Sequence, residues 1–253
     1  KNNLFRAIKM TEVGGEEKKD FDSQSISWQE DQPLKNYVQK FKTYYEKPKA
    51  VASSNRKFDS DIVRNVYRRF RLGYIVLFDI DKSRFFRKWN LEVNKGVIAK
   101  VEDLELKETV LLLEGNKRNT SCATITRNIG LRDKVTSEYY FLCMLVRNSM
   151  QYFELKVLLA DLHGIVRTFR IRNYATVATV QSRECLVPLR MKKGWNRLCI
   201  NLNQLCKDAY NTNYRQLLQL SVHNNCRLAY VLMLRDGIET KSFPPRYRTK
   251  KNM

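Results

Sequence analysis

The segment Trp195–Leu234 constrains the fold of this chain more than any other part of the sequence. Apolar residues recur at every second position over 198–202 and again over 218–222. Because side chains of a β-strand point alternately to its two faces, this period predicts strands with one buried face. Residues 203–210 are expected to form about two helical turns, and Arg227–Leu234 is apolar on both faces. Buried strands this close together predict a core built from β-sheets.

Short strand patterns separated by polar turns continue upstream. The expected strands are Gly73–Ile80, Val97–Val101, Val110–Glu114, Ala123–Thr126, Tyr139–Val146, Tyr152–Leu159, Ile165–Arg172 and 185–189. Tyr139–Val146 is apolar and is expected near the centre of a sheet, and DLHG at 161–164 predicts a hairpin turn. About ten short strands with frequent turns predict an all-β sandwich over 66–248, followed by a basic tail at 249–253.

Residues 1–65 lack this strand pattern and are predicted to be an N-terminal extension. Residues 1–31 are polar without periodicity, which predicts an extended arm. Apolar and aromatic residues at spacings of three and four predict an amphipathic helix over about 33–46. Its aromatic side chains either cover the core of the sandwich or dock on a partner. The candidate docking residues are Tyr37, Phe41, Tyr44 and Tyr45.

The charge of the chain is strongly basic and unevenly placed. The net charge is +21, of which residues 66–253, with 34 Lys and Arg against 16 Asp and Glu, contribute +18. The predicted sandwich therefore carries the excess, which indicates an acidic partner: nucleic acid, an anionic membrane or an acidic protein lattice.

Basic side chains on strands and turns of the sandwich are the candidate partner-binding residues. Strands hold their charges rigidly, which suits an acidic lattice of fixed spacing as well as it suits phosphates. Because a surface ion pair contributes about 0–1 kcal/mol, binding requires many of them. These candidates are Arg167, Arg170, Arg172, Lys192, Lys193, Arg227, Arg246 and Arg248.

The sequence contains no recognised catalytic or nucleotide-binding motif, so neither an enzyme nor a cofactor is expected. The acidic cluster at 102–108 is interpreted as a solvated loop or strand end. Asp79 and Asp81 are interpreted as a chance pair, and neither group is expected to bind a metal. His223 is interpreted as a hydrogen-bonded structural histidine.

The six cysteines show no CxxC spacing. Cys143, Cys185 and Cys199 lie in apolar strand patterns, which predicts buried free thiols and a reducing compartment. With two histidines in the chain, a zinc site is not expected. No signal peptide or membrane span is expected, because the longest apolar runs, Phe141–Val146 and Leu228–Leu234, are far shorter than about 18–20 residues.

Several motifs together resemble a known family. The matching pieces are RFRLGY at 69–74, WNLEVNKGVI at 89–98, LEG at 113–115, YF at 152–153, FR at 169–170, NY at 173–174, PLRMKKGWNRLCINL at 188–202, AYNTNY at 209–214 and VHNNCR at 222–227. Their order over about 69–248 resembles the cilia- and flagella-associated protein 20 family. Asn211 stands where the family has glycine, and residues 1–65 have no family counterpart, which indicates a divergent paralogue.

The resemblance implies a jelly-roll-like β-sandwich, similar to carbohydrate-binding modules. It implies a non-enzymatic protein that binds α/β-tubulin and helps link the A- and B-tubules at the doublet inner junction. The implied partners are a parkin co-regulated-type protein and other microtubule inner proteins, and the implied location is the cytoskeleton of the ciliary or flagellar axoneme, for example in sperm. The family's basic positions carry over to Lys100, Arg167, Arg170, Arg190 and Arg227.

Two alternatives remain open on the sequence alone. A carbohydrate-binding module would use exposed aromatic side chains such as Tyr174 and Trp195, although Trp195 is expected to anchor the core. A nucleic-acid-binding protein would explain the charge, but the chain lacks a stacking motif of the RNA-recognition or cold-shock type.

Overall fold

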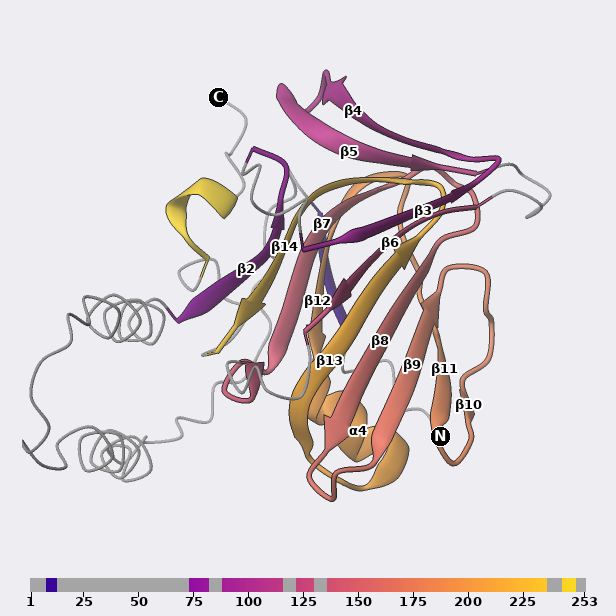
Figure 1. Ribbon diagram of the computed structural model, residues 1–253, viewed down its shortest axis with the longest axis vertical. Helices are drawn as coiled ribbons and strands as arrows, with labels where there is room; N and C mark the ends of the chain where they lie inside the picture. Colours follow the sequence, from indigo (N-terminus) through magenta and orange to yellow (C-terminus); the bar gives the residue numbers. More distant parts are fainter. Residues whose placement is uncertain are drawn as a thin grey trace, which may run out of the picture. The chain divides into compact units, whose positions relative to one another are not determined.

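The computed structural model describes residues 8–12, 73–81, 88–115, 122–129, 136–235 and 243–248. In these residues the chain forms two seven-stranded β-sheets, which confirms the predicted all-β sandwich (Figure 1). The predicted helix at about 33–46, with its four aromatic docking residues, and the basic tail 249–253 lie outside the described residues.

In the first sheet, each strand is antiparallel to its neighbours. Its order is β1 (Ile8–Glu12), β12 (Gly194–Asn201), β7 (Phe141–Asn148), β14 (Cys226–Leu234), β5 (Glu108–Glu114) and β4 (Val97–Asp103), with β2 (Tyr74–Asp79) paired to the second half of β14. The apolar strand β7 lies between β12 and β14, so its predicted central position is confirmed.

The second sheet is antiparallel except for the parallel pair β9 and β11. Its order is β10 (Thr179–Val180), β11 (Glu184–Pro188), β9 (Val166–Arg172), β8 (Glu154–Asp161), β13 (Tyr214–His223), β6 (Cys122–Asn128) and β3 (Asn90–Asn94). The predicted hairpin of β8 and β9 is present, and Gly164 in its turn has a φ of +79°.

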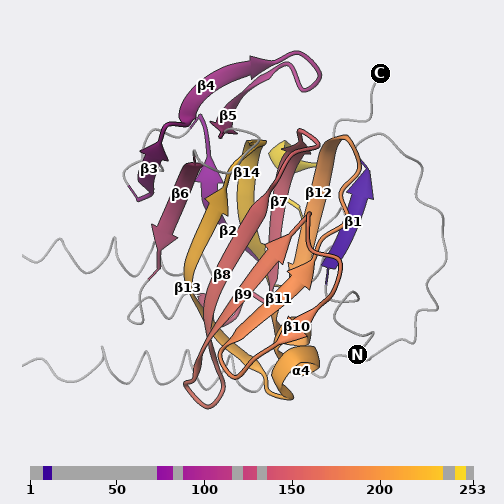
Figure 2. The same ribbon diagram turned by 90° about the vertical axis from the view of Figure 1, so that its right-hand side faces the viewer.

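The main hydrophobic core lies between the two sheets (Figure 2). Leu155, Val157 and Leu159 of β8 point into it, as the period of two predicts. The helix α4 (Leu202–Tyr210) contributes Leu205 and Cys206 to the same core. Within the described ranges, no helix is long and apolar enough to cross a membrane.

A second apolar cluster covers the outer face of the first sheet. Tyr230, Leu232 and Trp195 of β14 and β12 pack there with Phe243 and Tyr247, which belong to the C-terminal segment that contains the 3-10 helix η4 (Pro245–Tyr247). This cluster explains why β14 is apolar on both faces. It also buries Trp195, which anchors this outer cluster and not the core between the sheets.

Three strands were not among those predicted from the sequence. Strand β1 lies in the predicted extended arm and pairs with β12, which adds five residues of the arm to the sandwich. Strand β3 is an edge strand whose five residues are all exposed, and β10 has two residues. None of the three presents a buried apolar pattern of useful length in the sequence.

The six cysteines are free thiols. Cys143, Cys185 and Cys199 are buried, as predicted, and Cys206 and Cys226 are buried as well. Burial raises the pKa of Cys185 to about 11, so this thiol stays protonated near neutral pH.

Asn211 ends α4 in the left-handed conformation, with φ 53° and ψ 36°, and its backbone N–H donates to the carbonyl of Lys207 at 3.0 Å. Asn tolerates this conformation better than other residues with a Cβ, so the turn survives without the family's glycine. Asn211→Ala is expected to lower the free energy of unfolding by about 1 kcal/mol. Asn211→Gly, the control, should change it by less than about 0.5 kcal/mol in the same urea titration. Equal effects of the two variants would contradict this explanation.

Candidate partner-binding surfaces

On the outer face of the second sheet, Arg170 and Arg172 share one carboxylate. Arg170 donates to both oxygens of Glu154 at 2.7 and 3.1 Å, and Arg172 donates to Oε2 at 2.6 Å. The hydroxyl of Tyr174 donates to the same oxygen at 3.1 Å. Burial raises the pKa of Glu154, but the two arginines outweigh it and lower that pKa overall. Arg170 also lies 3.6 Å from a carboxylate oxygen of Glu184, so the two arginines are balanced by two glutamates within this group.

Arg167 occupies an internal position beside α4. Its guanidinium lies 2.9 Å from Oδ2 of the buried Asp161 and stacks 4.2 Å from the ring centroid of Tyr210. The Arg167 side chain is 12% exposed. Its contacts join the β8–β9 hairpin to the helix, and little of its charge is presented to a partner.

Arg227 belongs to a charge cluster around the buried Asp103 on the outer face of the first sheet. Arg227 and Arg147 donate to Oδ2 of Asp103 at 2.7 and 2.9 Å, and the indole N–H of Trp195 donates to Oδ1 at 3.1 Å. Burial raises the pKa of Asp103, but hydrogen bonds from Arg227, the Leu106 N–H, Trp195 and Arg147 outweigh it and lower the pKa to about 2.

The predicted solvated acidic cluster at 102–108 is therefore correct only in part. Glu102, Glu105 and Glu108 are exposed, whereas Asp103 is buried and neutralised by arginines. The partners Arg147 and Arg227 lie far along the chain, so local sequence gave no sign of this burial. The described residues contain no group of three or more His, Cys, Asp or Glu side chains arranged to hold a metal.

Asp79 and Asp81 hold the C-terminal segment, so they are more than the chance pair inferred from the sequence. Tyr247 donates its hydroxyl to Asp79 Oδ2 at 2.5 Å, and Arg246 pairs with both carboxylates. Arg248 donates to the carbonyl of Phe243 at 2.9 Å. The candidates Arg246 and Arg248 are exposed, and both also stabilise this segment.

The other basic candidates lie on exposed loops and edges. Arg190, Lys192 and Lys193 are exposed on the connection between β11 and β12, and Lys100 is exposed on the edge strand β4. The structure thus brings together Arg170 with Arg172, Arg190 with Lys192 and Lys193, and Arg246 with Arg248. It does not gather the ten candidates into one patch.

His223 makes the hydrogen bond predicted for a structural histidine. Its Nδ1 lies 2.9 Å from Oγ1 of Thr124 across the β13–β6 pair. Burial is the main cause that lowers the pKa of this imidazole.

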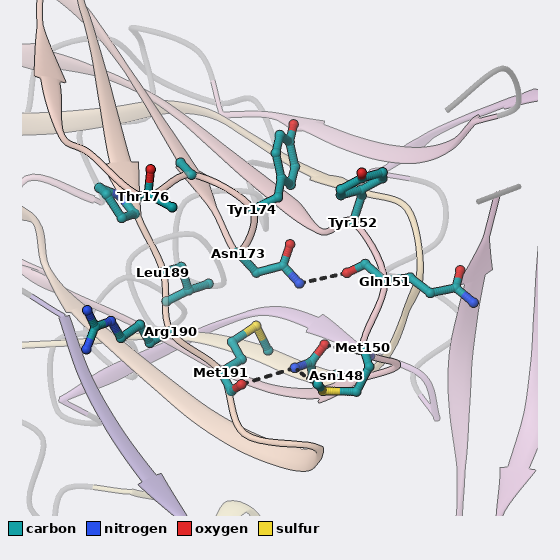
Figure 3. A pocket seen from close by; sticks show the side chains of 12 residues that line it. Asn148, Met150, Gln151, Tyr152, Asn173, Tyr174, Thr176, Leu189, Arg190 and Met191 are labelled. Carbon is teal, nitrogen blue, oxygen red and sulfur yellow. Dashed lines mark hydrogen bonds between the residues drawn. The ribbon is translucent and has the colours of Figure 1, made fainter. Parts of the chain in front are cut away.

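A pocket that sequence reasoning missed lies between three loops. The loops β7–β8, β9–β10 and β11–β12 border an open hollow of about 800 Å³ (Figure 3). The lining residues are Asn148, Met150, Gln151, Tyr152, Asn173, Tyr174, Ala175, Thr176, Pro188, Leu189, Arg190 and Met191. The motifs at 152–153 and 173–174 were the only sequence signal, since nothing local shows that these loops meet.

In the described residues these features define a β-sandwich with several basic surfaces and a loop-lined pocket. Residues 65–251 match the CFA20 domain, so the chain belongs to the CFA20-domain family. This finding confirms the family resemblance seen in the motifs.

Several curated relatives are named Cilia- and flagella-associated protein 20. The Caenorhabditis briggsae protein is 32% identical over 65% of this chain and 80% of its own length. The Paramecium tetraurelia protein is 27% identical over 71% of this chain and 93% of its own length. The Chlamydomonas reinhardtii protein is 31% identical over 63% of this chain and 83% of its own length.

Among solved structures, the chain is similar to a family 11 carbohydrate-binding module from Clostridium thermocellum in complex with a mixed-linked tetrasaccharide. That match has a TM-score of 0.35 and 8% identity, and it covers 64% of this chain and 96% of the module.

Proposed function

We propose that this protein is a structural, non-enzymatic microtubule-binding protein of the cilium or flagellum. It binds tubulin and helps link the A- and B-tubules at the doublet inner junction. The observation that carries this proposal is membership of the CFA20-domain family, whose relatives from a nematode, a ciliate and an alga are all named as cilia- and flagella-associated.

The charge of the sandwich supports tubulin as the partner. Residues 66–253 carry a net charge of +18, and tubulin offers an acidic lattice of regular spacing. Arg170 and Arg172 are fixed by ion pairs with Glu154 and lie on the outer face of the second sheet. Fixed charges lose little side-chain entropy on binding a regular lattice, so each contact retains more of its electrostatic gain.

The proposal extends to neighbours and location. In the axoneme the protein contacts α/β-tubulin, a parkin co-regulated-type inner-junction protein and other microtubule inner proteins. Axonemes of sperm are one setting for it. The support is the family membership together with the relatives' name, which says that they are associated with cilia and flagella.

Charge reversal on the β11–β12 connection tests which surface meets tubulin. Lys192→Glu with Lys193→Glu replaces two exposed cations by anions and is expected to weaken microtubule co-sedimentation about 10-fold. Lys207→Glu with Arg215→Glu is the matched control, since it changes the net charge equally at exposed positions on α4 and β13. The control should weaken binding by less than about 3-fold. Equal losses from both pairs would mean that net charge alone, and not this surface, decides binding.

A further inference from the structure

The pocket between the three loops is held open by side-chain amides. Asn148 donates to the carbonyls of Met191 and Lys192 at 3.3 and 3.2 Å and accepts from the N–H of Met150 at 2.9 Å. Asn173 accepts from the N–H of Phe153 at 2.9 Å, and its own amide donates to the carbonyl of Gln151 at 2.7 Å. These bonds join the loops in a fixed arrangement, which lowers the entropy cost of binding a ligand.

The walls of the pocket expose large apolar side chains to solvent. The exposed fractions are 65% for Met150, 47% for Tyr152 and 42% for Tyr174. The rings of the two tyrosines pack edge to face, with their centroids 5.0 Å apart. Met191 borders the same space (Figure 3). Exposed aromatic and methionine side chains around one preformed hollow are typical of a binding site, because methionine adapts its shape to an apolar partner.

The charge at the pocket is positive. Arg190 is the one charged residue of the lining, and the lining includes no Asp or Glu. Figure 3 shows Arg190 at the margin, on the opposite side from Tyr152. Lys193, on the same connection, is also exposed. The electrostatic field of these positive charges favours an anionic ligand.

A neutral sugar makes no use of the charge of this pocket. Gln151 and Thr176 are polar lining residues that offer hydrogen bonds to hydroxyl groups, but a neutral ligand leaves Arg190 without a counter-ion. The amides of Asn148 and Asn173 are already engaged with the backbone. Apolar walls beside a cation suit a ligand with an apolar side chain and carboxylates close together.

We propose that this pocket binds an acidic peptide segment of a protein partner. One apolar side chain of the peptide packs against Met150, Tyr152 and Met191, and a neighbouring carboxylate pairs with Arg190. This inference goes beyond the proposed function, since it assigns a ligand class to a defined pocket and needs no microtubule.

Fluorescence polarisation with the full chain tests it, using a labelled peptide Glu-Glu-Phe-Glu-Glu at physiological salt. Saturable binding is expected, and Tyr152→Ala and Arg190→Gln should each weaken it about 10-fold. Lys207→Gln on α4 is the matched control and should stay within about 2-fold of the natural protein. Thermal denaturation checks that each variant remains folded.

Two further peptides separate the contribution of the apolar side chain from that of the charge. Replacing Phe by Ala in the probe should weaken binding about 10-fold, and a Lys-Lys-Phe-Lys-Lys probe should not bind. The proposal is overturned by absence of saturable binding, by equal affinity of the two pocket variants and the control, or by binding of cellotetraose in place of the acidic peptide. Because microtubules are absent, these outcomes leave the proposed function to its own test.

Discussion

Asp103→Asn is expected to lower the free energy of unfolding by about 3 kcal/mol, because the variant removes the buried carboxylate that Arg147 and Arg227 share. The carboxylate of Asp103 is buried and accepts from Arg147, Arg227 and Trp195 at 2.7–3.1 Å. An Asn side chain would direct an N–H₂ donor at a guanidinium. Since the arginine side chains are 33% and 35% exposed, water relieves part of their repulsion, and the loss stays at the lower end for a buried pair.

Acid should remove this difference between the natural protein and the variant. The folded-state pKa of Asp103, about 2, lies below the usual value of about 3.9 for an unfolded chain. The stabilisation is therefore fully present above about pH 4 and is lost as the pH falls through about 2. Urea titrations near pH 6 and near pH 3 measure it, and the gap between the two proteins should be smaller at the lower pH. An unchanged gap would contradict the assignment.

Glu105→Gln is the control for the same cluster. Its carboxylate is largely exposed and meets Arg147 only at 3.5 Å. The loss should be below about 1 kcal/mol, as for other surface ion pairs. A loss as large as that of Asp103→Asn would show that burial is not what makes Asp103 important.

Gly96→Ala is expected to cost about 3 kcal/mol of unfolding free energy through steric overlap alone. Gly96 lies between β3 and β4, where the chain passes from the second sheet to the first. An added Cβ would lie 2.6 Å from the carbonyl oxygen of Glu114 and 2.8 Å from that of Cys122. Both are backbone atoms at the ends of β5 and β6, so no side-chain rotation relieves the overlap, and the strands must shift.

Gly194→Ala is the matched control for Gly96→Ala. A Cβ at Gly194 would meet nothing within 4 Å, but its φ of +86° disfavours alanine. The expected loss is about 1 kcal/mol of backbone strain. Equal losses in guanidinium titrations, or a loss below about 1 kcal/mol for Gly96→Ala, would contradict the predicted steric cause.

Strands that face the core could be predicted from the sequence, and those held by distant partners could not. Strands β12 and β13 are predicted because apolar residues alternate along them, and β14 is predicted because its residues form a continuous apolar run. Strand β1 pairs with the distant strand β12, as Ile8 does with Ile200, and no local pattern encodes that contact. Asp103 was likewise assigned to solvent, because its partners Arg147 and Arg227 follow 44 and 124 positions later.

On the candidate surfaces, too, contacts between residues far apart in the chain could not be predicted. The sequence identified the basic residues, but not that Arg170 and Arg172 share Glu154, which precedes them by 16 and 18 positions. Composition indicates an excess of charge, whereas the place of Arg190 beside a pocket depends on how three loops meet. The amides of Asn148 and Asn173 join these loops across 43 and 20 positions of the chain, so no local pattern predicts the arrangement.

Co-sedimentation of the full chain with taxol-stabilised microtubules, intact or with the acidic tubulin tails removed, tests the central proposal most directly. The protein is expected to pellet with intact microtubules at low salt, and less as salt rises, because the basic surfaces act through screened charge. Removal of the tails should reduce binding without abolishing it if the lattice itself is also recognised. Absence of the protein from the pellet at low salt would contradict a tubulin-binding role.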